Sequence, residues 1–526
     1  MLKRHLVGAA SGLALCLAAS GAFAQGAAPA GAPKKGGALQ VVVTPEPPML
    51  MQGLNQNGPT NMIAGNMYES LLRYDEKLNP QPSLAKSWEV SADQTVYTFH
   101  LQDGVKWHDG KPFGADDVVF TLDKFLRDVH PRWRPIVNGQ VKSIEKVDDA
   151  TVKITLKQPF GPFLLSQEVA SAPMIPRHIY EGTDYRANPA NNNPVGTGPM
   201  KFGEWKKGSY VKLVRNDEYW DKGKPYLDEM YFQFIPDAAA RAVAYETGKV
   251  DVLTGGAVEI FDVARLSKLP NTCVTTKGWE MFAPHAWSTP NTTRGILGNK
   301  TFRQAMMYAI DRDFGRDVIW SGYGKIPTGP ISSKTKFYSA DGVKTYKFDP
   351  EMAKKLVRES GYKGEKLQFL GLPYGETWTR WAEAIKQNFA DVGINMDIVS
   401  TDVPGWVQRT SNFDFDLTFN FLYQLGDPAT GVARSYVSTN IVKGNPFGNV
   451  GSYSNPEVDR LFAEAAIAPA EGRQALYTKV QQVMAEELPV LWLLELDFPT
   501  VSRCNVKDLV TTAIGIDDAA KNVWKQ

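Results

Sequence analysis

Short runs of alternating apolar and polar residues recur in the first half of the chain. Residues 95–101 alternate as Thr-Val-Tyr-Thr-Phe-His-Leu, and residues 38–43 form an apolar run. Both patterns are typical of β-strands. Residues 87–90 predict another strand, and the two alternating runs around residues 148–151 predict a hairpin. We therefore expect paired strands joined by polar turns in this half.

From Pro290 onward the apolar spacing changes to that of helices. Amphipathic helices are predicted over residues 301–319, 349–361, 378–393, 455–466 and 471–488. Strands are predicted between and after them, over residues 366–372, 394–400 and 489–503. Strands that alternate with helices indicate an α/β lobe with crossover connections.

One predicted strand in this half ends in a turn that is suited to ligand contact. The stretch FDFDLTFNFLYQLGDPATGV, residues 413–432, alternates and then reaches Tyr423, Gln424 and Asp427 before Pro428. Turns that follow strands often present side chains to ligands. We ask whether this strand end holds a ligand, and whether it does so by charge.

The N-terminus has the pattern of a secretory signal peptide. Lys3 and Arg4 precede an apolar run over residues 6–17, and Ala22-Phe23-Ala24 matches a small-residue cleavage site. The run is too short to span a bilayer as a helix. We expect export, with cleavage after Ala24 and a periplasmic mature protein. Residues 25–37 are rich in Pro, Gly and Ala, which predicts a disordered linker.

Composition excludes several partners. The 526 residues carry 58 basic and 57 acidic side chains, a formal net charge of +1, which favours neither nucleic acid nor an anionic membrane. A chain of this length is expected to form more than one domain. Two cysteines, Cys273 and Cys504, lie outside the signal peptide, and the sequence leaves open whether they form a disulfide or stay unpaired.

Enzyme motifs are missing from the sequence. It contains no Gly-x-Ser-x-Gly elbow, no His-Glu-x-x-His motif and no phosphate-binding loop. His100 and His108 lack a third ligand at metal spacing, so we predict neither a metal site nor a cofactor. Aromatic residues on loops suit a concave site for a small polar organic ligand, and Tyr374 and Trp378 stand where a predicted strand meets a helix.

Several motifs, in order, resemble extracellular solute-binding proteins of family 5, the peptide-, opine- and nickel-type receptors of ABC importers. They lie at residues 83–124, 193–205, 302–312 and 453–465, among others, and cover nearly the whole mature chain. The resemblance implies an α/β fold of two lobes that close over a ligand like a flytrap, the type II periplasmic binding protein, with an extra subdomain in the first lobe. It also implies a monomer that docks on an inner-membrane ABC permease and ATPase complex, with no catalytic activity.

The resemblance also implies domain bounds. The first lobe is expected over residues 38–280, with an inserted subdomain at 84–194. The second lobe is expected over residues 281–489, and residues 490–526 would return to the first lobe. Closure would be a population shift that ligand contacts with both lobes drive.

Both charged anchors that dipeptide-binding members of the family use are replaced here. Gln424 stands where those members place the Asp that pairs with the peptide ammonium group, and Leu372 stands where they place the Arg that binds the carboxylate. A buried ammonium group without an ionic partner is strongly disfavoured. Asp427 and Arg380 lie nearby as substitutes, although Asp427 could cap the turn before Pro428 and Arg380 could be a solvated helix residue. An opine, a modified peptide or a sugar–amino-acid conjugate is as compatible with these residues as a dipeptide.

We therefore predict a periplasmic receptor for a small polar organic solute of the peptide-like class. The expected ligand-contacting residues lie in both lobes and in the loop around Pro48: Tyr374, Trp378, Trp406, Tyr423, Gln424, Asp427, Trp287 and Met49. One alternative is a carrier of haem or a metal chelate, which would need an exposed residue such as His285 in the cleft. Others are an exported hydrolase, for which no motif is present, and a periplasmic chaperone.

Overall fold

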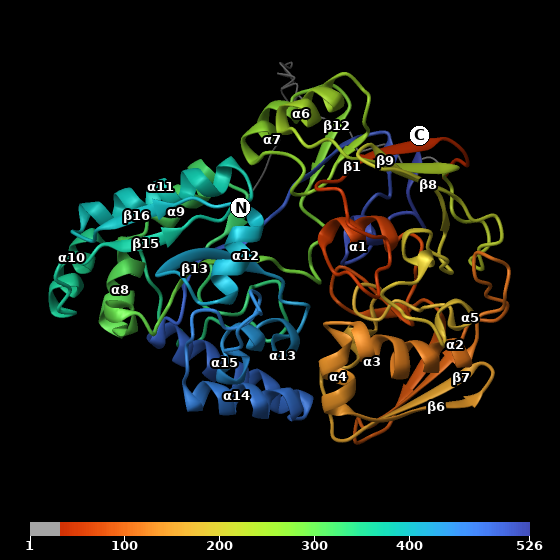
Figure 1. The fold of residues 1–526 in the computed structure, drawn as a ribbon, viewed down its shortest axis with the longest axis horizontal. Helices are drawn as coiled ribbons and strands as arrows, with labels where there is room; N and C mark the ends of the chain where they lie inside the picture. The colour runs from red at the N-terminus through yellow and green to blue at the C-terminus, as the bar shows by residue number, and fades with distance from the viewer. Residues whose placement is uncertain (1–31) are drawn as a thin grey trace, which may run out of the picture.

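The computed structural model describes residues 32–526 and divides them into two α/β lobes (Figure 1). The expected signal peptide and the start of the linker lie outside the described residues. The rest of the expected linker has no helix or strand, but Gly36 N donates to Tyr226 O at 2.8 Å and Gly37 N donates to the Asp228 carboxylate at 2.8 Å. The chain is therefore hydrogen-bonded to the first lobe from Gly36 onward.

A seven-stranded sheet forms the centre of the first lobe. Its order is β12-β19-β11-β1-β10-β9-β8, and β1 pairs in parallel with both β10 and β11. The strands are β1 (Ala38–Val42), β8 (Met200–Lys206), β9 (Tyr210–Arg215), β10 (Glu229–Gln233), β11 (Val252–Leu253), β12 (Thr272–Thr275) and β19 (Thr500–Arg503). The helices of this lobe include α1 (Gly58–Ala64), α6 (Ala238–Glu246) and α7 (Ile260–Leu266). The strand expected at residues 38–43 is confirmed as β1.

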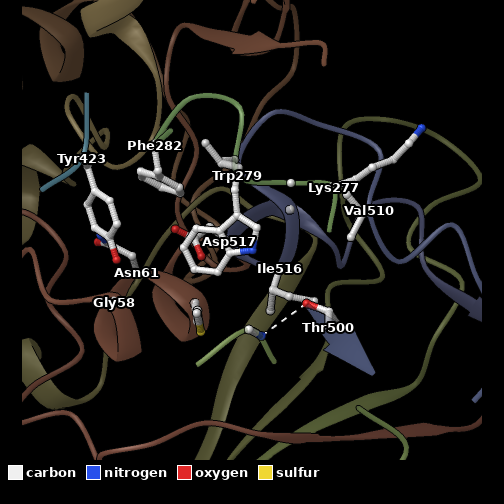
Figure 2. A pocket seen from close by; sticks show the side chains of 15 residues that line it. Gly58, Asn61, Lys277, Trp279, Phe282, Tyr423, Thr500, Val510, Ile516 and Asp517 are labelled. Atoms are coloured by element: carbon white, nitrogen blue, oxygen red, sulfur yellow. Dashed lines mark hydrogen bonds between the residues drawn. The ribbon is translucent and has the colours of Figure 1, made fainter. Parts of the chain in front are cut away.

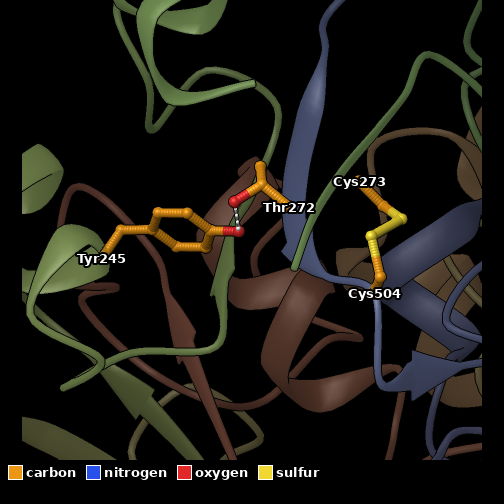
Figure 3. Close-up of a disulfide and its surroundings, with 4 residues drawn as sticks. All are labelled: Tyr245, Thr272, Cys273 and Cys504. Atoms are coloured by element: carbon orange, nitrogen blue, oxygen red, sulfur yellow. Dashed lines mark hydrogen bonds between the residues drawn. A yellow bond between two sulfur atoms is a disulfide. The ribbon is translucent and has the colours of Figure 1, made fainter. Parts of the chain in front are cut away.

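A disulfide links the C-terminal segment to this sheet. Cys273 lies in β12, Cys504 directly follows β19, and the two strands pair antiparallel with Cys273 opposite Ser502. Figure 3 shows the disulfide between Cys273 and Cys504, and Cys504 N also donates to Asn271 O at 2.9 Å. The sequence left the pairing of these cysteines open, and the structure joins them.

A smaller antiparallel sheet lies at the far end of the first lobe. Its order is β4-β5-β7-β6, and a run of helical segments packs against it. The elements are β4 (Ala85–Val90), β5 (Val96–Leu101), β6 (Val141–Asp148), β7 (Thr151–Leu156), α2 (Ala115–Val119), α3 (Leu126–Val129), α4 (Trp133–Gln140) and α5 (Arg177–Tyr180). Residues Phe120–Phe125 join α2 to α3 as a π-helical segment. All of these elements fall within residues 84–194, where we expected an inserted subdomain. A two-stranded ribbon, β2 (Leu72–Tyr74) with β3 (Pro80–Pro82), precedes them.

The second lobe is built on a six-stranded sheet of order β14-β18-β13-β17-β15-β16. The strands are β13 (His285–Pro290), β14 (Gly324–Lys325), β15 (Leu367–Leu370), β16 (Met396–Val399), β17 (Leu417–Leu422) and β18 (Leu491–Leu496). The helices are α8 (Lys300–Ala309), α9 (Arg312–Phe314), α10 (Pro350–Glu359), α11 (Glu376–Asp391), α12 (Val403–Ser411), α13 (Pro428–Gly431), α14 (Pro456–Ile467) and α15 (Ala470–Glu487). The central strands β13, β17 and β18 are almost entirely buried.

Two details differ from the sequence-based expectations. The helix expected over residues 301–319 ends at Ala309 and restarts at Arg312, because the Asp311 side chain accepts from Phe314 N at 2.9 Å and caps a new helix. The return to the first lobe occurs after residue 490. Strand β18 still pairs with β13, and the chain crosses between β18 and β19. A short antiparallel pair, β20 (Val506–Lys507) and β21 (Trp524–Lys525), then ends the first lobe.

The chain passes between the lobes twice, after β12 and after β18, and the lobes also touch away from these crossings. Gly161 N, from the loop after β7, donates to Ala466 O in α14 at 3.3 Å. Within the first crossing, between β12 and β13, Phe282 O accepts from Gln424 N at 2.6 Å. The lobes are therefore in contact at the first crossing and, away from it, between Gly161 and Ala466.

Candidate functional site

A cavity of about 1500 Å³ lies between the two lobes. Its first-lobe wall comes from the loop before α1, the start of α4 and the loop after β7, including Asn55, Arg132, Ile136, Phe160 and Glu168. Its second-lobe wall comes from the end of β17 and from α12, α13 and α14, including Tyr374, Trp406, Tyr423, Arg434 and Phe462. A solute in this cavity would touch both lobes.

Aromatic side chains form much of the second-lobe wall. The Tyr374 ring is 45% exposed and lies 6.1 Å from the Phe421 ring, centroid to centroid. Trp406 lines the cavity from α12, and its Nε1 donates to Thr418 Oγ1 at 3.0 Å, which fixes the indole. Burial, together with the negative charge of Asp517, raises the pKa of Tyr423 to about 12, so its hydroxyl is a neutral donor and acceptor at physiological pH.

A second, small cavity of about 30 Å³ adjoins the large one (Figure 2). Gly58 and Tyr423 line both cavities, and Trp279, Phe282 and Asp517 are among the other residues that line the small one. Burial raises the pKa of Asp517 well above its usual value, and the nearby carboxylate of Glu168 adds to the shift. The Asp517 carboxyl therefore favours its neutral form more than an exposed aspartate does.

The charged side chains that line the large cavity differ in their partners within the protein. Asp459 accepts from Ser438 N and Oγ, and Arg460 pairs with Glu464 at 2.8 Å. Glu168 accepts from Ala170 N at 2.6 Å, and burial raises its pKa. Arg132 and Arg434 form no ion pair with any residue in the range 32–526.

Gln424, expected to contact the ligand, points away from the cavity. Its Oε1 accepts from Ser332 N at 2.8 Å and from Thr335 Oγ1 at 2.9 Å. Its Nε2 lies 2.8 Å from Pro330 O and 3.0 Å from His285 Nδ1. Gln424 is 3% exposed, so its amide is fully used in joining β17 to the loop at residues 330–335. This geometry favours a structural role for Gln424.

Asp427 also has its partners within the protein. Its carboxylate accepts from Ala429 N at 2.9 Å, which caps α13, and from both Nη atoms of the buried Arg473. Of the two interpretations weighed from the sequence, the geometry favours the helix cap. Asp427 does not line the cavity.

The other predicted contacts divide in the same way. Tyr374, Trp406 and Tyr423 line the large cavity, whereas Trp378, Trp287 and Met49 do not. Trp378 is buried and stacks on Phe421 with centroids 5.5 Å apart. Trp287 is buried, and its Nε1 donates to Thr289 Oγ1 at 2.9 Å. Met49 packs against the first-lobe core. Arg380, the suggested substitute, is exposed on α11 outside the cavity wall.

Sequence reasoning missed the two cavity arginines. Arg434 carried one usable signal, because no acidic residue stands within four positions of it on either side. An arginine without a local acidic partner is a candidate for a more distant anion. Arg132 carried no such signal, since Asp128 stands four residues before it.

A metal site and a membrane-spanning helix each place requirements on the described residues. Within residues 32–526, no group of three or more His, Cys, Asp or Glu residues is arranged to hold a metal ion. His285 is fully buried, and burial lowers its pKa to about 3, so it is neutral and turned away from the cavity. Among the helices of the same residues, none is long and apolar enough to cross a membrane.

Comparison with known proteins places the chain among binding proteins. The family model described as bacterial extracellular solute-binding proteins, family 5, middle region, matches residues 79–442. Haem-binding protein A of Haemophilus influenzae is 28% identical over 84% of this chain and 83% of its own length. The oligopeptide-binding protein AppA of Bacillus subtilis is 29% identical over 88% of this chain and 87% of its own length.

A solved structure agrees with this placement. The periplasmic binding protein DppA of Helicobacter pylori, solved with the peptide STSA, is 27% identical and superposes with a TM-score of 0.81. The match covers 94% of this chain and 98% of that chain. The two-lobed arrangement in Figure 1 is thus that of a periplasmic binding protein.

Proposed function

We propose the following role for this chain, which belongs to the bacterial extracellular solute-binding proteins of family 5. It captures a small polar organic solute of the peptide-like class, such as a peptide, an opine or a related conjugate. It then delivers the solute to the permease of an ABC importer. It acts as a monomer, without catalysis, after export and removal of a signal peptide at Ala24.

The observation that carries the proposal is the cavity between the lobes. Its volume of about 1500 Å³ exceeds the roughly 300–1,000 Å³ that small-molecule sites usually have. This room suits an extended or conjugated solute better than a single dipeptide. Side chains from both lobes line it, so a bound solute would stabilise the closed arrangement relative to an open one.

The pattern of missing anchors supports the same ligand class. Leu372 is 3% exposed and Gln424 is fully hydrogen-bonded, so neither holds the terminal charge of a dipeptide. The expected contacts are now Tyr374, Trp406 and Tyr423, which present aromatic faces and hydroxyl groups to the cavity.

Thermal-shift screening of the ligand-free mature protein tests this proposal. The panel contains peptides of two to nine residues, opines, sugar–amino-acid conjugates, free sugars, haem and metal chelates. A true ligand binds the native state alone. At a concentration of one hundred times its dissociation constant it stabilises that state by about 2.7 kcal/mol, and so it raises the melting temperature. A peptide or conjugate hit that mass spectrometry shows unchanged after incubation is the expected result. Hydrolysis of the hit would contradict the absence of catalysis.

Haem belongs in the panel because one relative bears that name. Histidine ligation of haem would need an imidazole at the cavity wall, and no histidine of the described chain lines the large cavity. We therefore expect a weaker shift from haem than from the best peptide-like hit.

A further inference from the structure

Two arginines from opposite lobes, Arg132 and Arg434, line the same cavity, and neither forms an ion pair among residues 32–526. We propose that the captured solute is an anion, and that Arg132 and Arg434 together bind its carboxylate or phosphate group. This inference rests on the proposed function, which does not itself specify the charge of the solute.

Arg132 supplies the first-lobe contact. It stands immediately before α4 and lines the large cavity, and its Nη1 is buried without a hydrogen-bond partner among the described residues. Glu168 and Asp517 are near enough to attract the guanidinium, but neither forms an ion pair with it. Burial raises the pKa of both carboxyls, which weakens their ability to neutralise Arg132.

Arg434 supplies the second-lobe contact. It follows α13, and its guanidinium donates from Nη2 to Tyr423 O at 2.9 Å and from Nε to Gly431 O at 3.2 Å. These carbonyl contacts hold the side chain in place but carry no negative charge. Burial lowers the pKa of Arg434 to about 10, and the positive charge of Arg132 contributes to the shift.

The effect of Arg132 on the pKa of Arg434 indicates that the two guanidinium groups are near enough to repel each other. A buried guanidinium without an anion is unfavourable, and a second positive charge nearby makes it more so. The remaining acids of the cavity, Asp459 and Glu168, form no ion pair with either arginine; their close contacts are hydrogen bonds from Ser438 and from Ala170 N. The cavity therefore offers unneutralised positive charge to a ligand.

An anionic group between the arginines would resolve this arrangement. Guanidinium groups bind carboxylate and phosphate through paired, charge-assisted hydrogen bonds. Because one arginine belongs to each lobe, a shared anion would also hold the lobes together. The same contact would thus give both selectivity for anions and preference for the closed form.

Matched probe pairs test the charge of the solute directly. We would titrate the purified mature protein with Ala-Ala-Ala and its C-terminal amide, and with glutathione and its dimethyl ester. Maltose and a neutral cyclic dipeptide serve as uncharged members of the panel. Dissociation constants come from calorimetry, for wild type and for Arg132→Gln and Arg434→Gln. Arg409→Gln is the control, because Arg409 lies outside the cavity and pairs with Asp414 at 3.2 Å.

The anionic member of at least one pair is expected to bind ten-fold or more tightly than its neutral partner. Each cavity variant should reduce that affinity at least ten-fold, and Arg409→Gln should leave it within two-fold. The melting temperature of unliganded Arg132→Gln should stay unchanged or rise, because the variant removes an unpartnered buried charge. A merely structural arginine would lower it instead. This readout stands even if Arg434→Gln folds poorly.

Three results would overturn the inference. Equal binding of both members of every pair, or unchanged affinity in Arg132→Gln, would exclude an arginine-bound anion while the proposed function stands. Binding of the uncharged probes alone would do the same. Failure of every probe to bind the folded wild-type protein would count against the proposed function as well.

Discussion

Arg473 and Asp427 form a buried bidentate ion pair behind the second-lobe wall of the cavity. Arg473 Nη1 donates to Asp427 Oδ2 at 2.9 Å, and Nη2 donates to Oδ1 at 2.7 Å. The side chains are 5% and 1% exposed. The pair ties the turn after β17 to α15, and the same guanidinium lies against Gly161 of the first lobe. This ion pair therefore supports the cavity wall, and it also lies at the contact that Gly161 makes between the lobes.

Replacing Asp427 with Ala should lower the free energy of unfolding by about 3–5 kcal/mol. The change leaves Arg473 buried without its anion and removes the cap of α13. Urea unfolding followed by tryptophan fluorescence measures the loss.

The matched control is Glu464→Ala, which breaks an exposed pair with Arg460 and should change stability by no more than about 1 kcal/mol. If Asp427→Ala were as stable as wild type but lost binding of the best hit, Asp427 would be a ligand contact after all.

Gly161→Ala should weaken ligand binding with little effect on the stability of the free protein. A Cβ at this position would lie 2.3 Å from Arg473 Nη1, which is too close for the present contact between the lobes. The two lobes would have to move apart slightly at Gly161. A form in which the lobes are closed would therefore lose stability relative to an open form.

Calorimetry with the best hit should show a several-fold higher dissociation constant for this variant. Gly139→Ala is the control, since a Cβ at Gly139 meets no atom within 4 Å. An unchanged dissociation constant for Gly161→Ala would show that the contact between the lobes at Gly161 does not take part in closure.

The disulfide between Cys273 and Cys504 should contribute about 2–5 kcal/mol to stability. It closes a loop of 231 residues and so restricts the unfolded chain strongly. The double variant Cys273→Ser/Cys504→Ser should melt at a lower temperature than wild type. Reductant should destabilise wild type and leave the variant unaffected. A variant as stable as wild type would mean that the pairing of β12 with β19 suffices.

Asp517→Asn should stabilise the protein at neutral pH. Burial raises the folded-state pKa of Asp517 well above the unfolded value of about 3.9. Between these two pKa values the folded state binds more protons than the unfolded state, so stability falls as pH rises through that range. The neutral amide removes this loss at pH 7.

The gain over wild type should shrink as the pH falls toward about 4, which thermal melts across pH 4 to 8 would show. The neighbouring Asp518→Asn is the control with the opposite sign, because Asp518 Oδ2 pairs with Arg73 Nε at 2.5 Å. A loss of stability in Asp517→Asn at pH 7 would mean that Arg132 stabilises the ionised form more than burial opposes it.

Local patterns predicted the elements of the fold better than they predicted the site. An apolar run located β1, alternation located β5, and helical spacing located α11 and α15, because each pattern extends over most of its element. The sequence did not separate β18 from β19, because residues 489–503 were predicted as a single strand. Only strand pairing assigns β18 to one sheet and β19 to the other.

Which residues line the site depends on side-chain directions that the hydrophobic pattern alone does not give. Tyr423 and Gln424 are adjacent, and consecutive residues near a strand end point to opposite sides. Tyr423 faces the cavity, and Gln424 faces the loop at Ser332. Arg132 and Arg434 are 302 positions apart, so only the folded arrangement of the two lobes brings them to one cavity.

The central claim is that the cavity between the lobes binds the solute and that both lobes hold it. The most direct measurement is a crystal structure of the mature protein with its tightest hit from the thermal-shift panel. We predict the solute inside the cavity, with an anionic group within about 3 Å of both Arg132 and Arg434 and an aromatic contact from Tyr374 or Trp406. A solute that lies outside this cavity, or that contacts one lobe only, would contradict the account.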